Sequence, residues 1–197
     1  MSLTLGWFST ARGEGSLGML TLVLKAISSK TLDARIQFVF SNRGPGEHIG
    51  SDRFFQMVRE NDIPLVHHSS LEFRREVGTV ANNRDVYYAG VSNRLNKFSP
   101  DIIVLAGYML IVNAELCRRY TMINLHPALP HGPSGTWQEV IWKIIAQRDT
   151  HSGAMVHHVT KDVDDGQPLT YFTFPIQEGS FVPLWKALDA DSRTLEE

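Results

Sequence analysis

The chain has 197 residues, of which 43% are hydrophobic and 20% are charged, proportions that exclude wholesale disorder and are typical of one globular domain over 1–197. Nineteen Lys and Arg residues against 21 Asp and Glu residues give a net charge of −2, so no basic excess indicates nucleic acid or a membrane as partner. The single cysteine, Cys117, excludes an internal disulfide. Together with an N-terminus that lacks a signal peptide, it favours the cytoplasm.

The first half of the chain alternates short apolar runs with amphipathic segments of helical length. Leu3–Ser9 is predicted to be a strand, followed by the glycine-rich turn Thr10–Ser16 and by a helix over Leu17–Ile27, whose apolar residues share one face. The same patterns predict strand Ala34–Phe40, helix Ser51–Asn61, strand Ile63–Val66, helix Asn82–Phe98 and strand Asp101–Ala106.

The second half continues this alternation and ends differently. It is predicted to contain helix Asn113–Tyr120, strand Met122–His126, helix Trp137–Gln147 and strands Ala154–Thr160 and Leu169–Ile176. The order predicts an α/β fold of Rossmann type, with a doubly wound, mostly parallel sheet. Because Lys161–Pro168 is too short for a crossover, the last two strands are expected to pair antiparallel. Ligands are then expected beyond the carboxyl ends of the parallel strands.

The first turn carries a glycine motif. Gly13-Glu14-Gly15-Ser16-Leu17-Gly18 matches G-x-G-x-x-G between a predicted strand and a predicted helix. Free backbone N–H groups at a helix start attract phosphate, so the motif favours a phosphate site. A dinucleotide site and a purely structural turn remain alternatives. The second strand ends in Ser41-Asn42-Arg43 without the acidic residue of NAD sites, although Arg43 leaves NADP open.

The strand Met122–His126 carries the most informative pair of side chains. Asn124 and His126 lie two residues apart, so both point to one face of the strand, and Pro127 ends the strand there. An amide donor beside an imidazole suits carbonyl chemistry, because the amide stabilises a developing oxyanion and the imidazole relays a proton. The alternative is a hydrogen-bonded pair with no chemical role.

A third candidate site residue, Asp164, lies nearer the end of the chain. The carboxylate of Asp164 is suited to orient His126 and to raise its basicity. The alternatives are an ordinary turn and a metal site that uses Asp164 with His151, His157 and His158. Adjacent histidines on a strand point to opposite faces, which argues against one shared ion, so no metal is expected.

Other candidate residues have simpler interpretations. His67 and His68 are expected to be exposed in a loop. Cys117 lies beside two arginines that are able to activate a thiol, but no partner motif supports a nucleophile. Trp137 and Trp142 are expected to be packing residues of their helix.

Together these motifs resemble the formyltransferases that use 10-formyltetrahydrofolate. The resemblance runs from the first strand to about Ile176 and keeps the order of the motifs. The segments that carry it are Phe38–Arg43, Ser99–Met109, Ile123–Pro130, Val156–Val159 and Val163–Gly166. It implies a formyltransferase-like fold and direct transfer of a formyl group to an amine, with glycinamide ribonucleotide of purine biosynthesis as the first candidate.

The resemblance also implies a division of labour. Asn124 would hold the formyl oxygen, His126 would move a proton and polarise the reacting centre, and Asp164 would sustain His126. The folate would be bound by Met109, Leu110, Val112, Thr160, Lys161, Asp162 and Val163. The phosphate of the acceptor would be bound by Gly13, Gly15, Ser16 and Leu17.

Several positions depart from the family pattern. Leu17 stands where the family has Asn, and Leu110 stands where it usually has Arg. The stretch after His126 is one residue shorter than usual, and the stretch 165–168 carries one extra residue. The closing helix that supplies an acidic acceptor contact has no clear match in 184–197.

These departures keep other functions open. Within the family, the alternatives are formylation of another amine, such as a nucleotide sugar, and hydrolysis of formyltetrahydrofolate. Outside it, they are a NADP-binding oxidoreductase and a catalytically idle folate-binding module. The partners expected are small molecules, namely folate and a phosphorylated amine, and a homodimer is compatible with the resemblance.

Overall fold

The computed structural model describes residues 2–190, which form two compact units. The first unit contains residues 2–124 and 159–162, and the second contains residues 125–158 and 163–190. The prediction of one domain over 1–197 stays a prediction. Residues 191–197, the end of the segment in which no closing helix was recognised, lie outside the described residues.

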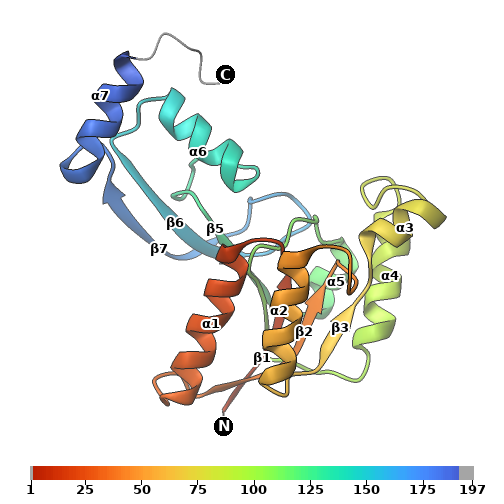
Figure 1. Ribbon diagram of the computed structural model, residues 1–197. Helices are drawn as coiled ribbons and strands as arrows, with labels where there is room; N and C mark the ends of the chain where they lie inside the picture. Colours follow the sequence, from red (N-terminus) through yellow and green to blue (C-terminus); the bar gives the residue numbers. More distant parts are fainter. Residues whose placement is uncertain (1, 191–197) are drawn as a thin grey trace. The chain divides into compact units, whose positions relative to one another are not determined.

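The first unit is a parallel α/β structure (Figure 1). Parallel pairing joins β1 to β2 and β4, β2 to β3, and β4 to β5. Its elements are β1 (Leu3–Ser9), α1 (Glu14–Ser28), β2 (Ala34–Ser41), α2 (Ile49–Glu60), β3 (Leu65–His67), α3 (Ser70–Glu76), α4 (Arg84–Leu95), β4 (Ile102–Leu105), α5 (Ala114–Arg119) and β5 (Met122–His126), whose last two residues belong to the second unit.

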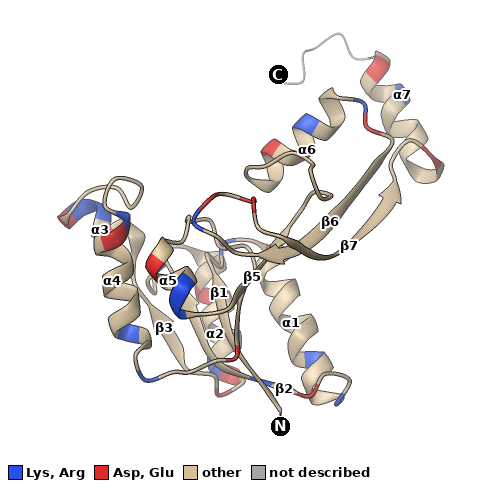
Figure 2. Cartoon of the chain, turned by 180° about the vertical axis from the view of Figure 1, so that it is seen from behind, with Lys and Arg blue, Asp and Glu red and all other residues tan. Residues whose placement is uncertain are grey.

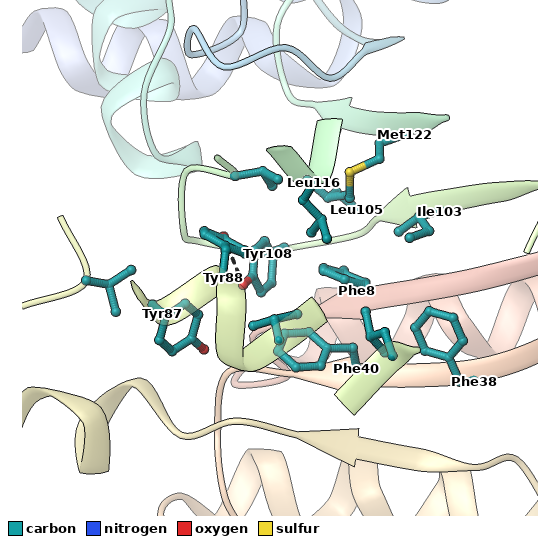
Figure 3. Packing of buried hydrophobic residues seen from close by; sticks show 14 of the residues in the cluster. Phe8, Phe38, Phe40, Tyr87, Tyr88, Ile103, Leu105, Tyr108, Leu116 and Met122 are labelled. Atoms are coloured by element: carbon teal, nitrogen blue, oxygen red, sulfur yellow. Dashed lines mark hydrogen bonds between the residues drawn. The ribbon is translucent and has the colours of Figure 1, made fainter. Parts of the chain in front are cut away.

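The two faces of this sheet carry separate cores because neighbouring strand residues point to opposite sides. Trp7 packs in a cluster with residues of α1 and α2 on one face, and Phe8 packs with α3, α4 and α5 on the other. Figure 3 shows this second cluster, in which the Tyr88 and Tyr108 hydroxyl groups lie 3.1 Å apart. Its largest fully buried aromatic residues are Phe8, Phe38, Phe40, Tyr87 and Tyr88.

The second unit contains α6 (Trp137–Ala146), β6 (His151–His158), β7 (Pro168–Pro175), a short 3-10 helix (Gly179–Phe181) and α7 (Val182–Ala190). A capping box between Thr136 and Glu139 begins α6, because each side chain satisfies the other residue's backbone N–H. Strands β6 and β7 pair antiparallel, as predicted. The core of this unit consists of Ala128, Val140, Ile144 and Ile176, with Phe181 and Trp185 packed against it.

The fold class is confirmed. The strand order is β3-β2-β1-β4-β5-β6-β7, parallel from β3 to β5 and antiparallel between β6 and β7. Among residues 2–190, no helix is long and apolar enough to cross a membrane.

Several predicted boundaries were wrong. Helix α1 begins at Glu14, within the predicted glycine turn, because Gly13 takes the N-cap position and an acidic residue is favoured in a first turn. Strand β6 begins three residues before the predicted Ala154, where pairing with β7 outweighs the polar sequence, and it ends before Thr160. Helix α4 is shorter at both ends than Asn82–Phe98. Helices α3 and α7 were not predicted.

The interpretation of the two tryptophans was also wrong. Trp137 and Trp142 are 53% and 52% exposed. Helix α6 buries Val140 and Ile144, which lie four residues apart on one face. Trp142 lies two residues from each of them and therefore points away from the core, and Trp137 occupies the first turn.

Candidate active site

The end of β5 carries the predicted amide–imidazole pair. Asn124 and His126 alternate with the exposed Leu125, so strand geometry directs both side chains to one face. Asn124 is the last residue of the first unit at this point, and His126 lies in the second unit. The His126 side chain is 4% exposed, and its Nε2 lies 2.9 Å from the carbonyl oxygen of Pro133. Because a carbonyl only accepts hydrogen bonds, Nε2 is the N–H donor.

Asp164 approaches the other nitrogen of the same ring. Its Oδ1 lies 3.4 Å from His126 Nδ1, which is the proximity predicted from the sequence. Its Oδ2 accepts a hydrogen bond from the backbone N–H of Gly135 at 3.3 Å, in the turn before α6. Asp164 has a left-handed backbone with φ of 54°, a conformation that aspartate tolerates better than most residues. The turn thus holds the carboxylate against the imidazole.

A second histidine faces the same carboxylate oxygen. His157, on β6, has its Nε2 3.7 Å from Asp164 Oδ1, and its side chain is 3% exposed. From the sequence, His157 was predicted only as an alternative metal ligand. Strand alternation separates His157 from His158, but only the structure shows that His157 is the buried one of the two. Among residues 2–190, no group of three His, Cys, Asp or Glu side chains is arranged to hold a metal ion.

In the first unit, the glycine motif forms the start of α1. Gly13 is the N-cap and makes no side-chain capping bond, so the first turn presents backbone N–H groups that no cap occupies. A Cβ added at Gly13 or Gly15 would meet nothing within 4 Å. These glycines are therefore not required by packing inside the protein, and they leave room for a ligand.

The predicted folate loop lies beside this turn. Thr10 donates its backbone N–H to the Gly107 carbonyl at 3.0 Å, and its Oγ1 accepts the Met109 N–H at 2.9 Å. Gly107 has φ of 68°, and a Cβ there would lie 2.6 Å from Ser16 Oγ, so only glycine fits. The structure therefore brings the glycine-rich turn and the start of the predicted folate loop together.

The remaining predicted folate residues divide between different surroundings. Lys161 and Asp162 line a cavity of about 620 Å³ in the first unit together with Arg84 and Asn113. Met109 is exposed and Val112 is buried, and neither lines this cavity. Leu110 and Thr160 do not line this cavity either. The Thr160 hydroxyl donates a hydrogen bond to the Asp162 carbonyl at 3.0 Å. Val163 is 50% exposed and belongs to the second unit.

Comparison with known proteins identifies the family. The model of the formyl transferase family matches residues 12–183. The phosphoribosylglycinamide formyltransferase of Schizosaccharomyces pombe is 31% identical over 156 residues, which are 74% of this chain and 75% of that protein. The chain belongs to the formyl transferase family. The enzyme of the same name from Dictyostelium discoideum is 29% identical over 167 residues, which are 80% of this chain and 78% of that protein.

Solved structures share the fold of this formyl transferase. Glycinamide ribonucleotide transformylase 1 from Symbiobacterium toebii superposes with a TM-score of 0.71 at 21% identity, covering 96% of this chain and 81% of that one. A formyltetrahydrofolate deformylase from Pseudomonas syringae gives a TM-score of 0.68 at 24% identity, covering 100% of this chain and 59% of that one. At these identities the likeness shows the fold alone.

The two leucines that depart from the family pattern have packing roles in this formyl transferase. Leu17 packs against the core beneath α1 and α2, and Leu110 packs against the aromatic cluster around Phe8. Neither side chain offers a polar group to a ligand. Binding at these two positions would therefore use backbone atoms.

Three other sequence candidates have structural surroundings of their own. His67 is exposed as expected, but His68 is half-buried and stacks on Tyr87, with ring centroids 4.6 Å apart. The expectation of exposure was therefore wrong for His68. Burial raises the pKa of the Cys117 thiol, which opposes the activation that neighbouring arginines would provide.

Proposed function

We propose that this chain transfers a formyl group from 10-formyltetrahydrofolate to the amine of glycinamide ribonucleotide, a step of purine biosynthesis. The observation that carries the proposal is the His126–Asp164 pair at the end of β5. Membership of the formyl transferase family and two relatives named phosphoribosylglycinamide formyltransferase support the same reaction.

In the proposed mechanism, the acceptor amine attacks the formyl carbon, and a carbon–nitrogen bond forms. The formyl oxygen becomes an oxyanion, which the Asn124 amide stabilises by donating a hydrogen bond. His126 polarises the same centre and, with Asp164, receives the proton that the amine loses. The bond between the formyl carbon and folate N10 then breaks, and N10 takes up that proton, so no net proton is consumed.

The two substrates would be bound mainly by the first unit. Met109, Leu110, Val112 and the segment 160–163 form the proposed folate site. The cavity lined by Lys161 and Asp162 lies within the usual size range of ligand sites, and Lys161 and Arg84 suit the carboxylates of a folate. Gly13, Gly15, Ser16 and Leu17, at the start of α1, form the proposed phosphate site.

The direct test is formyl transfer by the purified chain. The protein is mixed with 10-formyltetrahydrofolate and glycinamide ribonucleotide, and the formylated product is measured by mass spectrometry. Replacement of Asn124, His126 or Asp164 by Ala is expected to lower kcat roughly 10²–10⁴-fold, the range for a lost oxyanion donor or acid–base group. His151→Gln, at an exposed histidine of β6, is the matched control and is expected to keep the parent rate.

Other products would identify the alternatives. Release of formate without a formylated amine would indicate a hydrolase, and transfer to an amino nucleotide sugar alone would replace the acceptor. Absence of turnover with each of these substrates would contradict the proposed function. A Ser16→Ala variant with an unchanged acceptor KM would argue against a phosphorylated acceptor at α1.

The proposed function also bears on the partners, cellular location and oligomeric state of the chain. Small-molecule substrates suffice for the reaction, without nucleic acid or a membrane as partner. We propose the cytoplasm as its location and a homodimer as its assembly. Cell fractionation tests the first, and sedimentation equilibrium of the purified chain tests the second.

A further inference from the structure

Two side chains of the candidate active site are held by a short backbone segment, residues 133–136, which leads into α6. The Pro133 carbonyl accepts a hydrogen bond from Nε2 of His126 at 2.9 Å. The backbone N–H of Gly135 donates to Oδ2 of Asp164 at 3.3 Å. All of these residues belong to the second unit. The segment therefore orients both the imidazole and the carboxylate of the pair.

The other two residues of the segment are attached to side chains of α6. The Ser134 carbonyl accepts a hydrogen bond from Nζ of Lys143 at 2.9 Å. Thr136 donates its backbone N–H and its hydroxyl to Oε2 of Glu139, at 2.7 and 2.8 Å. The contacts thus alternate along the segment, because residues 133 and 135 hold the site whereas residues 134 and 136 are held by the helix.

Both attachments use charged side chains. Helix α6 carries one acidic and one basic residue, Glu139 and Lys143 (Figure 2). They lie four residues apart with the acidic residue first, the order in which two such charges best support each other on a helix. The hydrogen bonds from Thr136, with a smaller contribution from Lys143, hold the pKa of Glu139 below its ordinary value. Glu139 is therefore charged at neutral pH, and both attachments persist there.

The backbone at Gly135 fits this arrangement. Its φ of 127° is a conformation that residues with a side chain rarely adopt. A Cβ there would lie 2.7 Å from Oε2 of Glu139, the atom that accepts both hydrogen bonds from Thr136. A side chain at this position would therefore displace the Glu139 carboxylate. The same residue supplies the N–H that Asp164 uses, so the attachment to α6 and the active-site contact meet at one glycine.

We infer that Lys143 and Glu139 are positioning residues for formyl transfer. They hold the segment 133–136 in place, and the backbone of the segment keeps His126 and Asp164 aligned with each other. The inference rests on the proposed function, because it assigns their effect to proton transfer by that pair. Loss of either attachment releases the segment and slows the chemical step, whereas substrate binding by the first unit is retained.

The first test compares Lys143→Met with Lys143→Arg and Lys186→Met. Methionine at 143 removes the hydrogen-bond donor at similar length, whereas arginine keeps a charged donor. Lys143→Met is expected to lower kcat about 10-fold, less than the roughly 10²-fold that a displacement of about 1 Å costs, with substrate KM values within about two-fold of the parent. Lys143→Arg should recover most of the parent rate. Lys186→Met removes the same charge from an exposed position on α7 and should match the parent.

The second attachment is tested in the same assay. Glu139→Gln keeps an oxygen that accepts a hydrogen bond from Thr136, whereas Glu139→Ala removes it. The fall in kcat should be larger for the alanine variant than for the glutamine variant, again with substrate KM values close to those of the parent. Parental kcat in Glu139→Ala would overturn the role of this residue.

A further measurement does not depend on turnover. Hydrogen exchange of the Gly135 amide and of the His126 Nε2–H is followed by NMR in the parent and in Lys143→Met. If Lys143 holds the segment, both protons exchange faster in the variant, and the amides of β1 keep their parental rates. Unchanged exchange at both positions would overturn the inference, as would parental kcat in Lys143→Met. Faster exchange in a chain that transfers no formyl group would leave the attachments in place and reject the proposed function.

Discussion

His68 is a half-buried histidine that makes the stability of the chain depend on pH. Burial, with smaller contributions from Arg94 and His67, lowers its pKa from 6.5 to about 4. The folded chain therefore keeps the ring neutral down to about pH 4, whereas the unfolded chain takes up a proton near 6.5. The free energy of unfolding is expected to fall as the pH drops through this window. His68→Phe, which keeps a ring on Tyr87, should flatten the dependence, as measured by urea unfolding at pH 7.5 and pH 5.

His151, on β6, provides the control for this prediction. It is exposed and does not contribute to the pKa shift of His68, so His151→Gln should leave the pH dependence of unfolding as in the parent. If the free energy of unfolding changes equally with pH in the parent and in His68→Phe, His68 is not the source of the pH dependence.

Some residue positions in the site could be predicted from the sequence, and others could not. The proximity of Asp164 to His126 was predictable, because a strand end and a short loop restrict where each group lies. The contact of His157 with the same carboxylate required the pairing of β6 and β7, which sets its register. The exposure of Trp142 depends on which face of α6 is buried, and size and hydrophobicity alone do not determine that face.

At the scale of elements, one hydroxyl pair joins α4 to the loop after β4. Tyr88 and Tyr108 are both buried, and their oxygens lie 3.1 Å apart. Tyr88→Phe or Tyr108→Phe leaves a buried hydroxyl without this partner and is expected to cost about 1–3 kcal/mol of unfolding free energy. The double variant removes both groups and should cost less than the sum of the two single changes. A double-mutant cycle by urea unfolding measures the coupling, and strict additivity would contradict it.

Elements with a strong apolar period were predictable from the sequence, and short ones were not. Strands β1 and β5 have the predicted bounds, because runs bounded by turn residues leave little choice. Helix α3 has seven residues, follows the N-cap residue Ser69 and buries only Phe73, so its sequence shows almost no period. The start of α1 was missed because glycines at a helix N-terminus resemble a turn.

At the scale of the whole molecule, ligand binding separates the proposed function from the NADP alternative. A folate that binds only the folded chain, present at ~100 times its Kd, should add about 2.7 kcal/mol to the free energy of unfolding. A thermal shift assay with 10-formyltetrahydrofolate and, separately, NADP measures this effect. Protection by the folate alone is expected. Protection by NADP alone would instead support an oxidoreductase.

The overall architecture followed from the alternation of apolar runs and helical segments, together with the short loop after β6. The division into two compact units did not, because no composition shift or linker separates residues 124 and 125. After residue 124 the chain rejoins the first unit for only four residues, 159–162. Their packing depends on contacts between residues far apart in the sequence.

Strand β7 has a consequence for handling the protein in solution. It is the last strand in the sheet order, is exposed along its whole length and carries no charged residue between Pro168 and Pro175. Natural edge strands are usually blunted by charges, because an open edge is a template for adding strands from other molecules. Here only the terminal prolines serve that purpose. Fibril formation in concentrated, heated samples should therefore begin at residues 169–174, and a lysine introduced at Thr173 would raise the concentration at which the protein stays dispersed.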